Sequence, residues 1–148
     1  MLAISILKLR SVIELAIFSG IVCGPIIAQA DVIAERRANF KANAAAMKTI
    51  RAALGASDFE TVVTQATTIT KWAKAMPNYF PANSDMGHTK ACTDIWMDFD
   101  AFKLSASKNE KAALELINTA NKGNMSSTIN AVKQLGRSCK SCHNNFKN

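Results

Sequence analysis

Residues that interrupt helices are scarce in this sequence. Six glycines and three prolines occur among 148 residues, and beyond residue 30 the prolines are confined to Pro77 and Pro81. No segment alternates apolar and polar residues as a half-buried strand would. Alanine, the strongest helix former, is abundant. These features exclude a β-rich fold and predict a chain that is helical almost throughout.

Runs of basic residues are also missing, although the chain is basic. The formal net charge is +7 for the whole chain and +6 from Asp31 onward. The cations are spread along the sequence, with no run longer than Arg36-Arg37, and they do not alternate with aromatic residues. Nucleic-acid binding is therefore not expected. The charge favours solubility and encounters with acidic partners.

Histidine is limited to His88 and His143. The sequence contains neither a Ser-His-Asp constellation nor paired carboxylates, which are the usual signs of hydrolytic or acid–base catalysis. We therefore expect a binding or carrier protein rather than an enzyme.

The first 30 residues have the pattern of a secretory signal peptide. Lys8 and Arg10 precede an apolar run that ends in the small residues Ala28 and Ala30. The run from Leu15 to Ile27 has 13 residues and is interrupted by glycine and proline, so it is short for a membrane anchor. We predict cleavage after Ala30, a mature domain of residues 31–148 and a periplasmic location.

Apolar residues recur at helical spacing in four later segments. The expected helices cover residues 31–55, 57–76, 93–121 and 126–146. Ser57 and Glu60 are expected to form a capping box for the second helix, and the third is expected to bend or break near residues 105–109. The predicted fold is an all-α, antiparallel four-helix bundle. The irregular connection, residues 77–92, is a candidate functional loop.

Three cysteines follow the predicted cleavage site, namely Cys92, Cys139 and Cys142. Three thiols cannot all pair with one another in an oxidising compartment. Two of them belong to the sequence Cys-x-x-Cys-His, which ends with His143. The close pair must therefore serve some other purpose.

Three interpretations of this motif compete. A redox dithiol normally lies between a strand and a helix, and no strand is expected here. A structural zinc site needs four ligands, and only His88 and Cys92 remain to complete it. Covalent haem attachment uses both thiols as thioethers and the histidine as an axial iron ligand. On a helix Cys139 and Cys142 share one face with His143 beside them, so haem attachment is the preferred interpretation.

The sequence resembles the class II c-type cytochromes, and among them the cytochrome c′ family. The resemblance rests on "DVIAERRANFK", "MPNYFPANS", "DIWMDFDAF" and "LGRSCKSCHNNFK", and it extends over the mature chain. It implies one haem c attached near the end of the fourth helix. It also places the residue that faces the distal side of the iron on the first helix.

The resemblance assigns this distal position to Phe40. A phenyl ring cannot bind iron, so the implied haem is five-coordinate and binds small gases such as nitric oxide and carbon monoxide. An apolar distal side would offer bound dioxygen no hydrogen bond, so no stable adduct is expected. The alternative is a six-coordinate, low-spin electron-transfer protein with Met47 as distal ligand.

Further residues are implied to lie at the haem edge. Arg36 and Arg37 match positions near the propionates, where a guanidinium forms charge-assisted hydrogen bonds. The segment 85–88, with Met86, matches the loop that meets the haem. Lys147 stands where the family usually has arginine. The family also suggests a homodimer through the first two helices, while the sequence identifies no redox partner.

Overall fold

The computed structural model describes residues 24–148, with side chains from residue 31 onward. Most of the predicted signal peptide lies outside the described residues, so cleavage after Ala30 stays a prediction. The first helix begins at Gly24, within the predicted signal segment, and runs without a break through residue 55. Within the described range, no helix combines the length and apolar character needed to cross a membrane.

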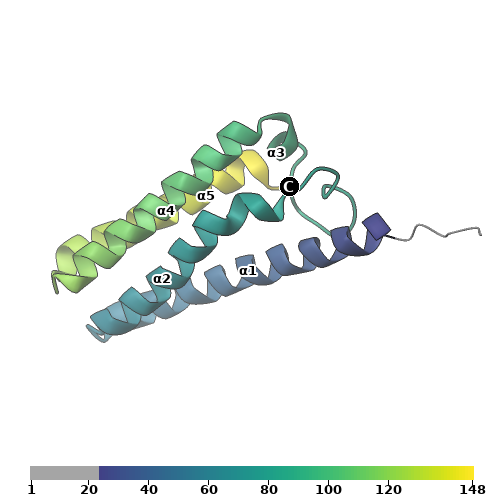
Figure 1. Ribbon diagram of the computed structural model, residues 1–148. Coiled ribbons are helices and arrows are strands. Elements are labelled where there is room, and N and C mark those ends of the chain that lie inside the picture. The colour runs from purple at the N-terminus through teal and green to yellow at the C-terminus, as the bar shows by residue number, and fades with distance from the viewer. Residues whose placement is uncertain (1–23) are drawn as a thin grey trace, which may run out of the picture.

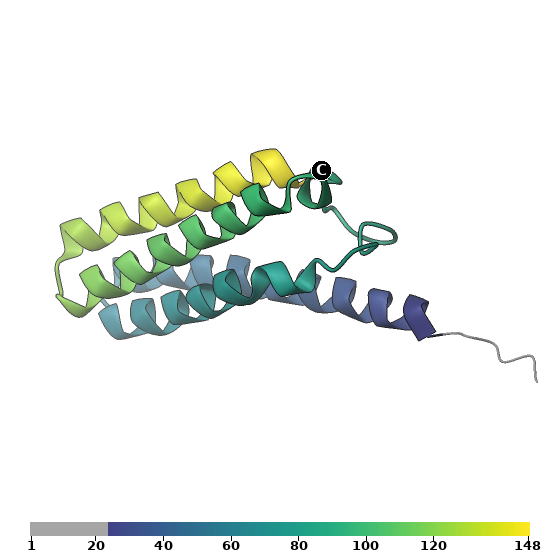
Figure 2. The ribbon, with the colours of Figure 1, turned by 45° about the horizontal axis from the view of Figure 1, so that its top comes forward.

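Four long helices form the body of the fold (Figure 1). They are α1 (Gly24–Gly55), α2 (Phe59–Ala75), α4 (Phe99–Asn121) and α5 (Met125–Phe146). Short turns make α1 and α2 one antiparallel hairpin and α4 and α5 another, and α2 packs against α4 (Figure 2). The predicted all-α four-helix bundle is confirmed.

The start of α2 differs from the predicted capping box. Asp58, not Ser57, caps the helix, and its carboxylate accepts hydrogen bonds from the backbone N–H of Thr61 at 2.9 Å and from its hydroxyl at 2.6 Å. Ser57 has a φ of 57° and lies in the turn that follows α1. The prediction was wrong by one residue because the left-handed turn moves the first helical position along the chain.

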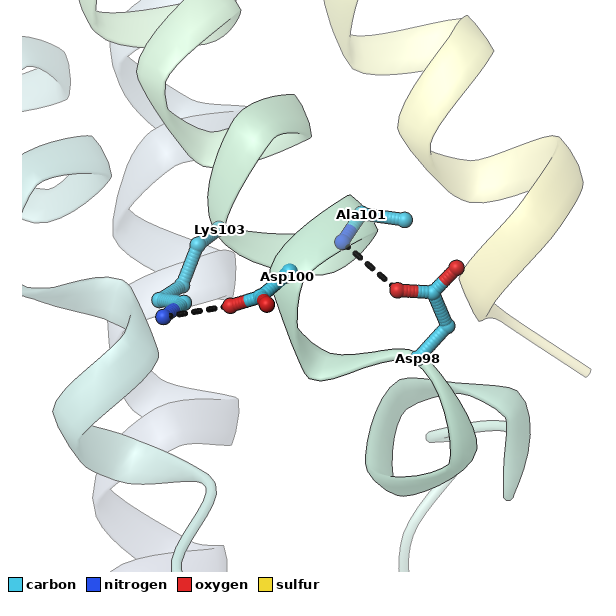
Figure 3. Close-up of polar contacts among 4 residues, drawn as sticks. All are labelled: Asp98, Asp100, Ala101 and Lys103. Atoms are coloured by element: carbon cyan, nitrogen blue, oxygen red, sulfur yellow. Dashed lines mark hydrogen bonds and ion pairs between the residues drawn. The ribbon is translucent and has the colours of Figure 1, made fainter.

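The third predicted helix is interrupted earlier than expected. It divides into α3 (Asp94–Met97) and α4 at Asp98, whose φ and ψ are −134° and 72°, whereas residues 105–109 are continuous helix. Figure 3 shows the reason: the Asp98 carboxylate accepts a hydrogen bond from the N–H of Ala101 at 2.9 Å and caps α4. One turn into α4, Lys103 and Asp100 form an exposed ion pair at 2.6 Å.

The core has an aliphatic and an aromatic half. The aliphatic half lies towards the α1–α2 and α4–α5 turns and includes Ile50, Ile69, Leu116 and Leu135. The aromatic half lies at the opposite end, beside α3 and the short helix η1 (Met76–Tyr79), and its rings meet mainly edge to face. Each such ring pair adds about 0.5–1.5 kcal/mol beyond its buried area. The aromatic half holds α3 and the following helix beside the site described next.

Candidate haem site

A cavity of about 710 Å³ lies between α1 and α5, near the aromatic half of the core. These two helices do not pack closely against one another, whereas every other neighbouring pair of long helices does. The cavity is lined by members of three segments, 36–47 of α1, 102–109 of α4 and 139–147 at the C-terminus, together with loop residues 88–91 and Ile69 of α2. Its volume is in the range of about 300–1,000 Å³ that is typical of small-molecule and cofactor sites.

Helix α5 brings three predicted site residues to one wall of this cavity. Cys139, Cys142 and His143 all line it, because residues three and four apart on a helix share one face. The two cysteines are partly buried and are not joined by a disulfide. The arrangement presents two thiols and an imidazole to a cavity that can accept a large, flat aromatic group.

Burial favours the uncharged forms of these groups. It raises the pKa of Cys142 to about 11, with the nearby Cys139 as a second cause, and it also raises the pKa of Cys139. Burial, followed by the positive charge of Lys147, lowers the pKa of His143. A neutral imidazole is the form that binds a metal, whereas a protonated thiol is a poor nucleophile for disulfide exchange. The lowered pKa of His143, a residue that is exposed where it lines the cavity, is compatible with axial ligation.

The zinc interpretation lacks the ligands it requires. In the part of the chain that the structure describes, no three His, Cys, Asp or Glu side chains are placed to hold a metal ion together. Cys92 instead donates a hydrogen bond from its thiol to Asp94 Oδ2 at 3.1 Å. A largely apolar cavity with two thiols and one imidazole on a single wall fits haem better than zinc.

Phe40 forms the wall opposite α5. Its ring lies tilted toward His143, with ring centroids 6.4 Å apart and planes at 64°. Trp72 and Phe80 support the ring at centroid distances of 5.2 and 6.5 Å. Met47 also lines the cavity, two helical turns further on, but it packs in the aliphatic half of the core with 9% of its surface exposed. The phenyl ring rather than the thioether therefore faces the imidazole.

Arg36 is buried, with 2% of its surface exposed, and it holds the loop that follows η1. Its Nη1 donates to Ser84 Oγ at 3.0 Å, and its Nη2 donates to the Ser84 carbonyl oxygen and to Thr89 Oγ1, both at 2.7 Å. The guanidinium also lies over the Phe80 ring, 4.7 Å from its centroid. Burial lowers the pKa of Arg36, which nearby Asp85 partly offsets. Arg36 lines the cavity, but its principal hydrogen bonds anchor the loop, so a contact with a propionate stays a prediction.

The remaining predicted haem-edge residues have different surroundings. Arg37 is exposed at the cavity rim. Lys147 also lines the cavity, and its backbone forms an isolated antiparallel β-bridge with Ala91. Met86 is 73% exposed and is not among the lining residues, so the structure does not bring it to the cavity.

Two asparagines at the cavity were not identified from the sequence. Asn109 of α4 is buried, and its amide donates to Ser138 Oγ at 2.9 Å and to Cys139 Sγ at 3.3 Å. Asn43 of α1 lies between Phe40 and Met47 on the same helical face. The sequence feature that could have identified these two asparagines is a polar residue within the apolar stripe of a predicted helix. Asn43 lines the same cavity as Phe40, and the apolar surroundings expected on the distal side stay a prediction.

Comparisons with a family model and with known proteins agree on one family. The model of the family described as "Cytochrome C'" matches residues 31–147. The chain is 34% identical to cytochrome c′ from Rhodopseudomonas palustris, over 91% of this chain and 96% of that protein. It is 30% identical to cytochrome c-556 from Agrobacterium fabrum, over 95% and 97% of the two chains. A shorter match, 37% identical, spans half of this chain and 51% of cytochrome c′ from Rhodospirillum rubrum.

Solved structures show the same fold. The structure of cytochrome c′ from Rhodopseudomonas palustris has a TM-score of 0.71 and 31% identity, covering 80% of this chain and 96% of that one. A nitric oxide complex of a mutant cytochrome c′ from Alcaligenes xylosoxidans has a TM-score of 0.72 at 18% identity, covering 80% of this chain and 94% of that one.

Proposed function

This chain belongs to the cytochrome c′ family and carries covalently bound haem c, and from this premise we propose that it is a periplasmic protein whose five-coordinate haem binds nitric oxide and carbon monoxide. The observation that carries the proposal is the position of Phe40 opposite His143. A phenyl ring has no lone pair, so Phe40 could not bind iron from this position, which supports an open coordination site. When bound, the haem would supply an iron to which a small gas can bind.

The chain's own residues have distinct roles in this proposal. Cys139 and Cys142 would hold the haem through their sulfur atoms, and the neutral imidazole of His143 would hold its iron. Asn109 donates to Cys139 Sγ and orients the first thiol. Phe40 covers the open side and admits only small ligands. We propose no catalytic role for any of these residues.

A second candidate function is electron transfer by a six-coordinate haem. Met47 lies on the same wall as Phe40 and lines the same cavity, which is the observation in its favour. Its thioether would have to reach past the position of the phenyl ring. Exchange of electrons with a redox partner is also compatible with the five-coordinate form.

The absorption spectrum of the purified holoprotein tests the proposal. A broad high-spin Soret band, with new bands on addition of nitric oxide or carbon monoxide, is the expected result. Sharp low-spin bands with a methionine–iron feature would replace the proposal with the electron-transfer alternative. Mass spectrometry of the periplasmic fraction should find one haem on a chain that begins at Asp31. A chain that retains residues 1–30, or that stays in the cytoplasm, would contradict the proposed location.

A further inference from the structure

The charged side chains that line the cavity are all basic. In the described part of the chain, no aspartate or glutamate is among the lining residues, whereas four of them are exposed cations, namely Arg37, Lys41, Lys90 and Lys147. The single ion pair within residues 31–148 joins Lys103 to Asp100 on α4. The four cavity cations therefore make no ion pair with a carboxylate of the described chain.

Hydrogen bonds bring the cations of α1 and of the loop together. Arg37 and Lys41 are four residues apart on α1, so their side chains are neighbours on one face of that helix. Arg36, next to Arg37, donates to Thr89 Oγ1 at 2.7 Å. This bond holds the loop against α1, and Lys90 directly follows Thr89. The loop cation is thus fixed beside the helical pair.

The C-terminal segment adds the fourth cation to the same group. The backbone N–H of Asn148 donates to the carbonyl oxygen of Lys90 at 3.0 Å, and Lys147 pairs with Ala91 in a β-bridge. Burial, and after it the positive charge of Lys147, lowers the pKa of His143, so this charge acts at the α5 wall of the cavity. Three segments that are distant in sequence therefore place like charges at one cavity.

The haem of this family would not neutralise all of these charges. Its pair of propionates can match two of the four exposed cations. Arg36 is buried, and its guanidinium already donates to Ser84 and Thr89. With the haem in place, a net positive charge would remain where the cavity meets solvent. Such an excess attracts a partner of opposite charge.

We propose that these four cations form the docking surface for a one-electron redox protein with an acidic face. This inference rests on the haem of the family and on the proposed exchange of electrons, not on gas binding. Opposite charges steer two proteins into contact and mainly raise the association rate. In the exchange, the partner is oxidised by one electron, which the ferric iron takes up, and no atom is transferred.

The location of the charges favours a redox protein over an anionic membrane. Electron transfer requires the partner to approach the haem closely, and the four cations line the cavity that would hold it. Membrane binding needs basic side chains on the surface but no particular relation to that cavity. The membrane therefore becomes an alternative outcome of the test.

The test uses the haem-loaded protein in the ferric state, with reduced plant-type ferredoxin as an acidic one-electron probe. Stopped-flow absorption measures its second-order reduction rate at about 10 mM ionic strength, where exposed charges are weakly screened. We expect Lys41→Gln and Lys90→Gln each to slow the reaction about two- to fourfold, and the double variant about five- to tenfold. At about 0.5 M salt these differences should nearly disappear.

Two controls separate a local charge effect from other causes. Lys133→Gln removes the same charge from an exposed position on α5, about 15 Å along the helix axis from His143, and should leave the rate nearly unchanged. Hexaammineruthenium(II), a cationic reductant, should react about twofold faster with the double variant, because less positive charge repels it. A structural defect would instead change both rates in the same direction.

Several results would overturn the docking surface. One is an unchanged ferredoxin rate in the double variant, and another is equal slowing by Lys133→Gln. A third is binding to vesicles of phosphatidylcholine and phosphatidylglycerol that the double variant loses while its ferredoxin rate stays unchanged, because the cations would then serve a membrane. A wild-type protein that binds neither nitric oxide nor carbon monoxide would overturn the proposed gas binding, whereas the reduction rates would still decide the docking surface.

Discussion

The rings of Phe40 and His143 face each other across one cavity, with centroids 6.4 Å apart. They come from α1 and α5, the neighbouring pair of long helices that do not pack closely. The aromatic contacts of Phe40 with Trp72 and Phe80 hold its ring in this position. If Phe40 covers the open side of the haem, as we propose, access from the α1 side would depend on movement of this supported ring.

Removing the Phe40 ring should open the gas-binding side. We expect Phe40→Ala to accelerate carbon monoxide association about tenfold or more, which corresponds to a barrier lowered by about 1.4 kcal/mol. Stopped-flow absorption after mixing with carbon monoxide measures the rate. Met47→Ala is the control and should leave both the rate and the resting spectrum unchanged. If instead Met47→Ala changes the resting spectrum and Phe40→Ala does not alter the rate, Met47 is the ligand and Phe40 is a core residue.

Haem attachment should depend on the two cavity thiols and not on the third cysteine. Cys139→Ser and Cys142→Ser should each weaken covalent attachment, since each removes one thioether. Cys92→Ser should retain it, because Cys92 does not line the cavity and its thiol donates a hydrogen bond to Asp94 at the start of α3. Mass spectrometry after expression with haem-maturation machinery measures the attached haem. His143→Ala should lose the native spectrum even where thioethers form, and an unchanged spectrum would point to a different axial ligand.

Arg36 and its neighbour Arg37 should differ strongly in their contribution to stability. Arg36→Met leaves the Ser84 carbonyl and the Thr89 hydroxyl without their donor, so we expect the free energy of unfolding to fall by about 1–3 kcal/mol. The exposed Arg37→Met should change it by no more than about 0.5 kcal/mol. Urea unfolding of the haem-loaded protein gives both values. Equal effects in the two variants would mean that Arg36 does not anchor the loop.

The cap of α2 predicts a pH-dependent stability difference. Hydrogen bonds from Thr61 lower the pKa of Asp58 below its ordinary 3.8. A carboxylate with a lowered folded-state pKa stabilises the fold above pH 3.8, and this stabilisation is lost as pH falls through the folded-state pKa. Asp58→Ala should therefore lower the melting temperature at pH 7 and have little effect in strong acid. Ser57→Ala is the control, and a larger effect there would restore Ser57 as the cap.

A homodimer through the first two helices has a suitable surface on α1. The outer face of this helix carries exposed, small side chains that permit close approach, namely Ala34, Ala38, Ala42, Ala45 and Ala52. We expect sedimentation velocity to show a dimer that Ala45→Glu converts to monomer, while Lys111→Glu on α4 has no effect. A wild-type monomer would contradict this prediction, and so would a dimer that tolerates Ala45→Glu.

Local sequence patterns were sufficient to predict the helices and the three residues that form one wall of the site. The helical spacing of apolar residues predicted four helices, and the Cys139, Cys142 and His143 spacing predicted three side chains on one face. Both inferences work because helix geometry depends on residues three or four apart. The loop between α2 and α3 was also foreseen, because Pro77 and Pro81 interrupt the helical pattern.

Packing between distant segments decided the rest of the site. Arg36 and Arg37 are adjacent and chemically identical, yet Arg36 is buried against Ser84 and Thr89 while Arg37 is exposed at the rim. Likewise, Asn109 reaches Cys139 from 30 residues away. Such partners depend on the crossing and separation of whole helices, which arise from all core contacts together and leave no local pattern around either residue.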